Sequence, residues 1–300
     1  MDAEQAARKL LIEGKSIRAV QRATGLTYYR VRQLSALPRF QVVTKHNARR
    51  VFGYTDIHWS DRDEHALAIA QHAQGIFAPD VTVLGGDLLN CTAFSRHPKR
   101  KLDHDEGYDY LESELKPANR FLDEVQRWTR DETVLLEGNH DEWFERWIRN
   151  TEGAMGLQSL LPSRYLCQRD AFRYVSFSPG RDKRQCNYQL APFLVATHGW
   201  CAPKYAAQHH LDRAKDISVI FHHTHRFDDR AVPLFRGGPI RATSAGCLCK
   251  RIPMYAHNGS PTDWTHGFWV AFVGRQSFTV YPVLIANGSA VLPDGTEVRA

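Results

Sequence analysis

The stretch VTVLGGDLLN at residues 81–90 joins a short apolar run to a polar turn. The run has the length and β-branched composition of a buried strand, and the glycine pair permits a tight turn before Asp87. Four more segments share this design, each an apolar run that leads into histidine, aspartate or asparagine. They are VFGYTDIHWSD (51–61), TVLLEGNHDEW (133–143), FLVATHGW (193–200) and SVIFHHTHR (218–226). The pattern predicts five buried strands, each with a functional loop at its C-terminal end.

The segments between these predicted strands have helical character, notably residues 63–74 and 112–129. Strands that alternate with helices indicate an α/β fold, in which functional sites gather at the C-terminal ends of the strands. The tail at 267–300 instead alternates apolar and polar residues around turn signals, which predicts closing antiparallel strands. We therefore expect the five polar loops to converge on one site.

The composition is that of a globular chain of 300 residues, 43% hydrophobic and 24% charged. It excludes collagen-like and disordered classes, and the apolar runs are much shorter than the roughly 20 residues that cross a bilayer. The N-terminal sequence MDAEQAARKL lacks the basic start and continuous apolar stretch of a secretory signal. We therefore expect a cytoplasmic protein with no membrane partner, whose six scattered cysteines are free thiols.

Positive charge is concentrated near the N-terminus. The formal net charge is +6, yet residues 1–50 contain 11 Lys or Arg and 3 Asp or Glu and so carry +8, which leaves −2 for residues 51–300. A local basic excess is the electrostatic footprint of a protein that contacts polyanions, because phosphate contacts release condensed counterions. The N-terminal region is therefore a candidate for nucleic-acid binding.

Residues 1–37 have the pattern of a helix-turn-helix module. Apolar residues recur at helical spacing, Ser16 and Thr27 are candidate N-caps, and Gly25 separates the second predicted helix from the third. The segment resembles the small helix-turn-helix modules of resolvases and transposases. Residues 38–49 have the composition of a linker with one short strand at 40–43, and residues 50–300 form a second domain.

The third predicted helix carries residues that can reach bases or phosphates in a DNA major groove. They are Tyr28, Tyr29, Arg30, Arg32 and Gln33. A module for self-association or partner docking is the alternative interpretation. The basic excess favours DNA.

The polar residues at the predicted strand ends have the chemistry of metal ligands. Asp56 and His58 lie two residues apart, so in an extended chain both side chains point to one side. Asp87 has two carboxylate oxygens and can bridge a pair of ions. The candidate ligands are Asp56, His58, Asp87, Asn139, His198, His223 and His225. This mixed nitrogen and oxygen set suits manganese, iron, zinc or nickel better than magnesium or calcium.

The ordered set Asp-x-His, Gly-Asp-x-x-Asn, Gly-Asn-His-Asp, His-Gly and His-x-His resembles the calcineurin-like metallophosphoesterases, and the resemblance covers roughly residues 50–285. Within that family it is most similar to the phage and prophage members described as exonuclease-like. The resemblance implies a four-layer α-β-β-α sandwich with two divalent metal ions, expected to be Mn²⁺, at the sheet edge. It assigns Asp56, His58, Asp87 and His225 to the first metal, and Asp87, Asn139, His198 and His223 to the second.

The same resemblance implies hydrolysis of phosphoric esters. Two divalent ions lower the pKa of a bridging water and hold the phosphoryl oxygens for in-line attack. His140 is similar to the family's non-ligand histidine, which lies beside the leaving-group oxygen and donates a proton to it. Asp141 is the candidate to orient His140.

Two departures from the family pattern stand out. His222 occupies the place of the usual glycine in Gly-His-x-His. The Gly-Asp-x-x-Asp-Arg of protein phosphatases ends here in Asn90 and Cys91, without the arginine that grips a monoester phosphate. Candidate phosphate contacts elsewhere are Arg96, Lys99, Arg100, Lys101 and Arg226, with a solvated loop and an ordinary salt bridge as the alternatives.

These observations favour a two-metal phosphodiesterase or nuclease with DNA as its partner. A second hypothesis is a phosphoesterase for small molecules such as nucleotides or cyclic nucleotides, with the N-terminal module serving assembly. A third is a DNA-binding regulator whose phosphoesterase fold is a degenerate scaffold. Homo-oligomer formation is left open by the sequence.

Overall fold

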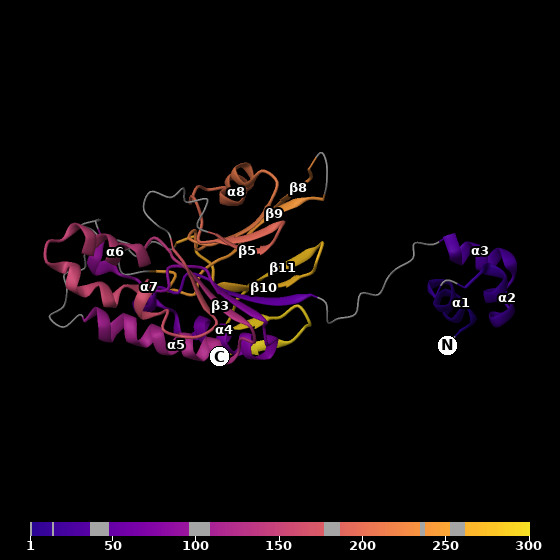
Figure 1. The fold of residues 1–300 in the computed structure, drawn as a ribbon, viewed down its shortest axis with the longest axis horizontal. Helices are drawn as coiled ribbons and strands as arrows, with labels where there is room; N and C mark the ends of the chain where they lie inside the picture. Colours follow the sequence, from indigo (N-terminus) through magenta and orange to yellow (C-terminus); the bar gives the residue numbers. More distant parts are fainter. Residues whose placement is uncertain are drawn as a thin grey trace. The chain divides into compact units, whose positions relative to one another are not determined.

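The computed structural model describes residues 2–13, 15–36, 48–95, 109–176, 187–234, 238–252 and 262–300. The chain forms two compact units, Met1–Asn47 and Ala48–Ala300, each of which is described by itself (Figure 1). The predicted strand at 40–43 and the candidate contacts Arg96, Lys99, Arg100 and Lys101 lie outside the described residues.

Two sheets form the centre of the larger unit. The first contains the strands β11 (Phe278–Leu284), β10 (Gly267–Val273), β1 (Arg49–Tyr54), β2 (Val81–Leu84), β3 (Glu132–Leu136) and β4 (Phe172–Val175), in that order. The second contains β5 (Asn187–Ala191), β6 (Leu194–Thr197), β7 (Ser218–Phe221), β9 (Ile240–Ala245) and β8 (Phe227–Val232). Strands β1 to β4 are parallel to one another, and so are β6, β7 and β9. The antiparallel tail is confirmed, since β10 pairs with β11, and β12 (Ser289–Val291) with β13 (Glu297–Arg299).

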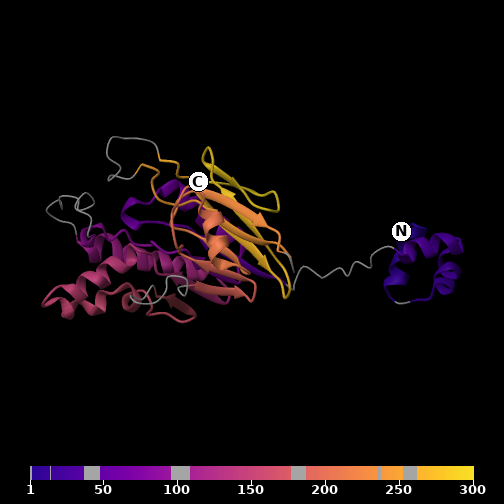
Figure 2. The same cartoon turned by 90° about the horizontal axis from the view of Figure 1, so that it is seen from above.

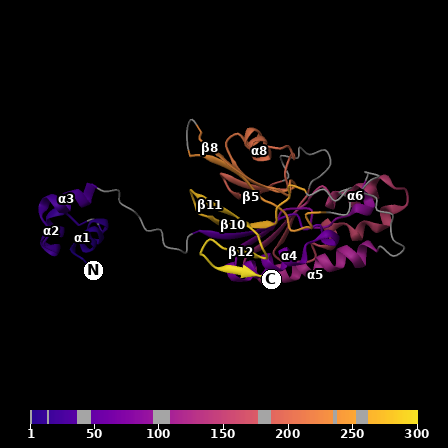
Figure 3. The ribbon, with the colours of Figure 1, turned by 180° about the vertical axis from the view of Figure 1, so that it is seen from behind.

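Helices cover the outer faces of both sheets, which gives four layers in the order α-β-β-α (Figure 1). The helices are α4 (Glu64–Phe77), α5 (Lys116–Arg127), α6 (Asp141–Asn150), α7 (Pro162–Tyr165) and α8 (Ala206–Ala214). Shorter helical turns are η1 (Trp59–Asp61), η2 (Thr92–Phe94), η4 (Leu111–Leu115) and η5 (Ala154–Leu160). Figure 2 shows α8 lying across the second sheet, and Figure 3 shows β12 near α4. The predicted α/β sandwich is confirmed.

Successive side chains of each central strand point to opposite faces of its sheet and therefore pack into two different hydrophobic cores. In β2, Val83 packs between the sheets, while Leu84 packs in the core that α4 and α5 cover. In β6, Ala196 packs between the sheets, while Val195 packs in the core beneath α8. These strands are therefore buried on both faces, as parallel strands commonly are. They give a rigid base to the loops that follow them.

The smaller unit is a bundle of the helices α1 (Ala3–Ile12), α2 (Ile17–Thr24) and α3 (Tyr28–Ala36). The predicted caps are confirmed, because the Ser16 hydroxyl accepts from the Ala19 N–H at 3.3 Å and Gly25 ends α2 with a φ of 71°. Its buried apolar side chains are Ala7, Leu11, Val20, Val31 and Leu34. The candidate DNA contacts Tyr28, Tyr29, Arg30, Arg32 and Gln33 are all exposed.

From the sequence we expect neither a membrane-spanning segment nor a disulfide bond. In the described part of the chain, no helix is long and apolar enough to cross a membrane. The cysteines within that part are free thiols, and Cys91, Cys247 and Cys249 are buried. Their burial is consistent with packing as small apolar groups.

One buried histidine of α8 lies outside the predicted motifs. The Nδ1 of His210 donates to the Ala206 carbonyl oxygen at 2.8 Å, and its Nε2 accepts from the Trp200 N–H at 3.0 Å. The bond from Trp200 requires a neutral ring, because a protonated Nε2 cannot accept. Burial lowers the pKa of His210 to about 4.

Acidification should therefore destabilise the protein through His210. Between the ordinary histidine pKa of about 6.5 and the folded value of about 4, the unfolded chain binds a proton that the folded chain does not, so stability falls as the pH falls. Between pH 7 and pH 5 we expect the wild type to lose about 2 kcal/mol more than His210→Gln in urea unfolding. Equal losses of unfolding free energy in the wild type and in His210→Gln would contradict a neutral, buried His210.

Candidate metal centre

The C-terminal ends of five strands meet at one edge of the sandwich. In the first sheet, β1, β2 and β3 end just before the loops that carry Asp56, Asp87 and Asn139. In the second sheet, β6 ends directly before His198, and β7 ends two residues before His223. The candidate ligands therefore arrive from both sheets.

Among the described residues, two groups of metal-capable atoms share Asp87, and a third consists of His58, His225 and Cys249. Of the two that share Asp87, one is Asp56, His58, Asp87 and His225, and the other is Asp87, His198 and His223; within each, the ligand atoms all lie within 4.8 Å of one another. The Nε2 of His58 lies 3.6 Å from Asp87 Oδ2, and the Nε2 of His198 lies 3.4 Å from the same oxygen. One carboxylate thus faces both groups, as a bridging ligand does.

The two carboxylates of the cluster are buried, with Asp56 0% and Asp87 1% exposed. Burial would raise the pKa of Asp87, but the imidazoles of His198 and His140 hold it well below its usual value. Burial likewise opposes ionisation of Asp56, and the hydrogen bond and charge of His225 lower its pKa. Both groups are therefore ionised, and buried anions require positive charge or donors around them.

His198 indicates that the cluster stabilises a cation. Its Nδ1 donates to the Gly85 carbonyl oxygen at 2.9 Å, so its Nε2 faces the amide oxygen of Asn139, 3.1 Å away. Burial alone would lower the pKa of His198, but the charges of Asp87 and Asp56 raise it to about 9. Positive charge is thus favoured where several acceptors converge. Carboxylate, imidazole and amide donors together fit a divalent transition metal.

His58 is oriented by Asn90, to which the sequence analysis gave no role. The Asn90 Nδ2 donates to Ser60 and Asp61, so its Oδ1 faces His58 Nδ1, 3.3 Å away. Since the amide oxygen only accepts, His58 donates from Nδ1 and presents Nε2 to the cluster, 3.1 Å from His225 Nε2. Metal-binding histidines commonly have such a partner behind the ring.

Glu114 is a second residue that the sequence analysis missed. Its fully buried carboxylate accepts from the backbone N–H groups of Asn90 at 2.8 Å and Cys91 at 3.0 Å, which fixes the loop after β2. It lies in η4, 24 residues from Asn90 and outside any motif. The sequence offers only an acidic residue next to apolar Leu115 as a signal.

The backbone is strained at four of the ligands. The φ angle is 47° at His58, 50° at Asp87, 72° at His223 and 57° at His225. Residues other than glycine rarely adopt this left-handed conformation, which costs about 1 kcal/mol or more at each position. Such strain persists only where the surrounding structure holds it, and it concentrates at functional sites.

His140 lies beside the ligand cluster. Its backbone N–H donates to Asp87 Oδ1 at 2.8 Å, and its ring centroid lies 4.5 Å from that of His58. The Nδ1 lies 2.7 Å from the Asn90 carbonyl oxygen and donates to it. The ring stacks on Trp143 with centroids 3.9 Å apart. These contacts fix the ring next to the metal-capable atoms.

The structure gives Asp141 a different role from the expected one. Its two carboxylate oxygens accept from the backbone N–H groups of Leu89 and Gly138, each at 2.9 Å. Asp141 therefore ties the loop after β2 to the loop after β3, and the Asn90 carbonyl orients His140 instead. Burial and the charge of Asp87 raise the pKa of Asp141 to about 7.

Arg226 is engaged in structural contacts. Its guanidinium pairs with Asp263 at 3.1 Å and donates to the carbonyl oxygens of Ala202 and Pro203. These contacts fasten the loop that follows His198. They match the ordinary salt bridge that was the alternative to a phosphate contact.

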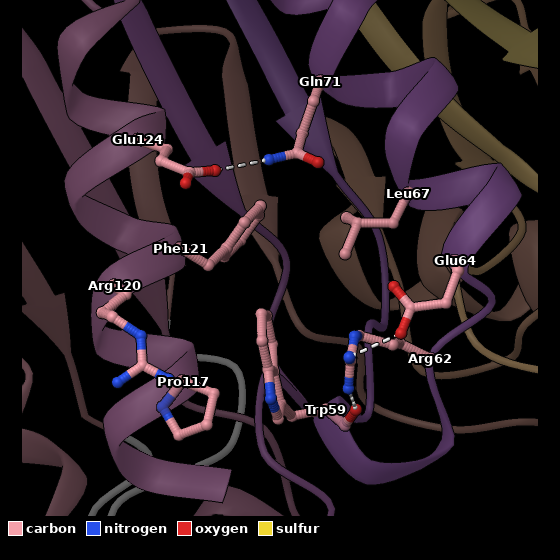
Figure 4. A pocket seen from close by; sticks show the side chains of 9 residues that line it. All are labelled: Trp59, Arg62, Glu64, Leu67, Gln71, Pro117, Arg120, Phe121 and Glu124. Atoms are coloured by element: carbon pink, nitrogen blue, oxygen red, sulfur yellow. Dashed lines mark hydrogen bonds and ion pairs between the residues drawn. The ribbon is translucent and has the colours of Figure 1, made fainter. Parts of the chain in front are cut away.

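A pocket of about 330 Å³ lies between α4 and α5 (Figure 4). The rings of Trp59 and Phe121 lie side by side in its wall, and Arg62 pairs there with Glu64 at 2.5 Å. The pocket borders η1, the turn that follows the ligand His58. As far as the described chain goes, its lining includes none of the metal-capable residues, so we place the chemistry at the ligand cluster.

Solved structures with a similar fold include Vacuolar Protein Sorting 29 from Cryptosporidium parvum, with 9% identity and a TM-score of 0.45 over 85% of this chain and 100% of that one. The phosphoesterase YfcE from E. coli has 15% identity and a TM-score of 0.32, over 78% and 98%. The nuclease MPE from Pseudomonas putida has 8% identity and a TM-score of 0.28, over 77% and 87%. No curated protein matches the chain in sequence.

The family model for calcineurin-like phosphoesterases matches residues 49–238, which is more than half of the chain. That segment contains all five loops and all seven candidate ligands that the sequence predicts. The chain therefore belongs to the calcineurin-like phosphoesterase family, whose members use a pair of divalent metal ions to hydrolyse phosphoric esters.

Proposed function

We propose that this protein is a Mn²⁺-dependent phosphodiesterase that cleaves DNA. The observation that carries the proposal is the pair of ligand groups sharing the buried carboxylate of Asp87. The first ion would be held by Asp56, His58, Asp87 and His225, and the second by Asp87, Asn139, His198 and His223. Bound ions of this kind activate a water molecule and neutralise phosphoryl oxygens.

His140 would act as the general acid. Its Nδ1–H is used by the Asn90 carbonyl oxygen, so proton transfer to the leaving oxygen falls to Nε2. Stacking on Trp143 and the backbone bond to Asp87 keep the ring in place without making it a ligand. Removing it should therefore affect turnover and leave the metal ligands intact.

A diester substrate is supported by the loop after β2. At the position where protein phosphatases carry an arginine, Cys91 is fully buried and its backbone N–H is held by Glu114. Asn90 is occupied with His58. Positions 90 and 91 thus offer no guanidinium to grip the second negative charge that a monoester carries and a diester lacks.

A DNA substrate is supported by the smaller unit. Residues 1–47, which carry a net +6 (9 Lys or Arg and 3 Asp or Glu), lie outside the phosphoesterase match, and Tyr28, Tyr29 and Arg32 are exposed on α3. Arg30 is held by Glu4 at 2.7 Å and by Gln33 at 3.1 Å, so it would exchange these partners for phosphate. Such a module would anchor a long polyanion near the catalytic unit.

Manganese should stabilise the folded protein. At a free concentration a hundredfold above the Kd, one bound ion adds about 2.7 kcal/mol to the free energy of unfolding. We expect Mn²⁺ to raise the Tm of the metal-free wild type and of Asp212→Asn, an exposed control, but not of Asp87→Asn. An equal rise of the Tm in Asp87→Asn would show that Asp87 is not a metal ligand.

His140→Ala should lower kcat by about 10²- to 10⁴-fold, the usual contribution of a general acid. The measurement is cleavage of labelled single- and double-stranded linear DNA with Mn²⁺, beside a generic phosphodiester and a generic phosphomonoester. Metal content, measured on the same samples, should match the wild type, and the exposed His209→Ala is the matched control. Turnover of the small esters alone would replace DNA by a small phosphoester as substrate, and undiminished activity in His140→Ala would refute its role.

The smaller unit is tested in the full chain by Tyr29→Ala combined with Arg32→Ala. We expect DNA binding to weaken by about tenfold and to depend less steeply on salt, because a phosphate contact is lost. Hydrolysis of a small diester should not change, and Gln5→Ala on α1 serves as control. Equal effects on both substrates would show that the unit acts through the catalytic unit rather than on DNA.

A further inference from the structure

His222 occupies the place of the family's usual glycine and lies buried beneath the metal loops. Its Nδ1 lies 2.7 Å from the Thr197 carbonyl oxygen, and the indole N–H of Trp269 donates to its Nε2 at 3.0 Å. A carbonyl only accepts, so Nδ1 carries the hydrogen and Nε2 supplies the lone pair. The ring is thereby fixed at both nitrogens.

The bond between His222 and Trp269 crosses from one sheet to the other. Trp269 lies on β10 in the first sheet, and His222 follows β7 in the second. The first sheet is shaped around both rings. A Cβ on Gly85 would lie 2.2 Å from the His222 ring, and a Cβ on Gly53 would lie 1.8 Å from the Trp269 ring. Two adjacent strands thus lack side chains where this pair needs room.

The spacing of the two sheets sets the distances between the metal ligands. The gap of 3.4 Å between Asp87 and His198 joins a residue of the first sheet to one of the second. Thr197, which His222 contacts, directly precedes His198, and His223 directly follows His222. The hydrogen-bonded chain from Trp269 through His222 to Thr197 therefore adjoins both imidazoles of the second group.

We infer that this chain, which we name the cross-sheet strut, is a positioning device for the second metal. Its hydrogen bonds keep His198 and His223, which follow strands of the second sheet, close to Asp87, which follows a strand of the first sheet. The inference rests on the metal site of the proposed function, and it assigns His222 and Trp269 as positioning residues. Residues behind metal ligands commonly change metal affinity by about 10- to 100-fold when replaced.

The test is Mn²⁺ titration of the metal-free full chain by calorimetry, with electron paramagnetic resonance to detect coupling between two bound ions. The variants are His222→Phe, Trp269→Phe and the double variant, with His222→Gln as the conservative replacement that keeps a donor and an acceptor. Ile220→Val is the matched control, because it perturbs the inter-sheet core that also contains Trp269 and removes neither hydrogen bond of the strut.

We expect each single phenylalanine variant to bind the weaker Mn²⁺ at least tenfold less tightly and to lose the coupled signal. The double variant should lose no more than His222→Phe, because that single variant already breaks both hydrogen bonds of the strut, including the one that Trp269→Phe removes. His222→Gln should recover much of the affinity, and Ile220→Val should lower only the Tm.

Two coupled ions bound at wild-type affinity in both single variants would overturn the inference, whatever happens to their Tm. Additive losses in the double variant would overturn it as well. A wild type that fails to bind two ions would overturn the proposed metal site, and the inference with it. The first two results leave the proposed function standing, so the failures are distinguishable.

Discussion

A carboxylate as deeply buried as that of Asp87 must have donors or positive charge around it, because an isolated buried anion is very costly. The partners of Asp87 come from both sheets: His58 at 3.6 Å follows a strand of the first, and His198 at 3.4 Å follows a strand of the second. The two sheets must therefore stack with the C-terminal ends of β2 and β6 aligned. The four-layer sandwich is the arrangement that achieves this with both outer faces covered.

Strain in the loops is the second consequence of this constraint. Left-handed backbone at His58, Asp87, His223 and His225 turns each side chain inward immediately after a strand. These conformations hold because the strands ahead of them are buried on both faces, and because Glu114 and Asp141 bind the connecting N–H groups. The rigidity that stabilises the fold is thus the same rigidity that keeps the ligands in register.

The sequence was sufficient to predict the five strands that lead into polar loops and the convergence of those loops, because each motif is local: an apolar run, a turn and a polar residue within about ten positions. It was insufficient where the decisive contact joins distant residues. Asp141 binds Leu89 across 52 positions, and Trp269 binds His222 across 47. In the sequence, His222 is only a histidine where the family pattern has a glycine. In the structure, its ring fills space that is open because Gly85 has no side chain. Membership of the phage branch and the helix-turn-helix role of the smaller unit stay predictions.

The charge distribution supports the proposed DNA substrate. Residues 48–300 contain 30 Lys or Arg and 30 Asp or Glu and so carry no net formal charge, which means that the catalytic unit without its metal ions attracts a polyanion weakly. Residues 1–47 contain 9 Lys or Arg and 3 Asp or Glu and so carry +6, and none of the described residues among them belongs to the metal cluster. Attraction and chemistry therefore reside in different parts of the chain, and only a substrate long enough to contact both can use both. A nucleic acid strand has that length and a uniform negative charge, whereas a small ester gains nothing from the basic unit.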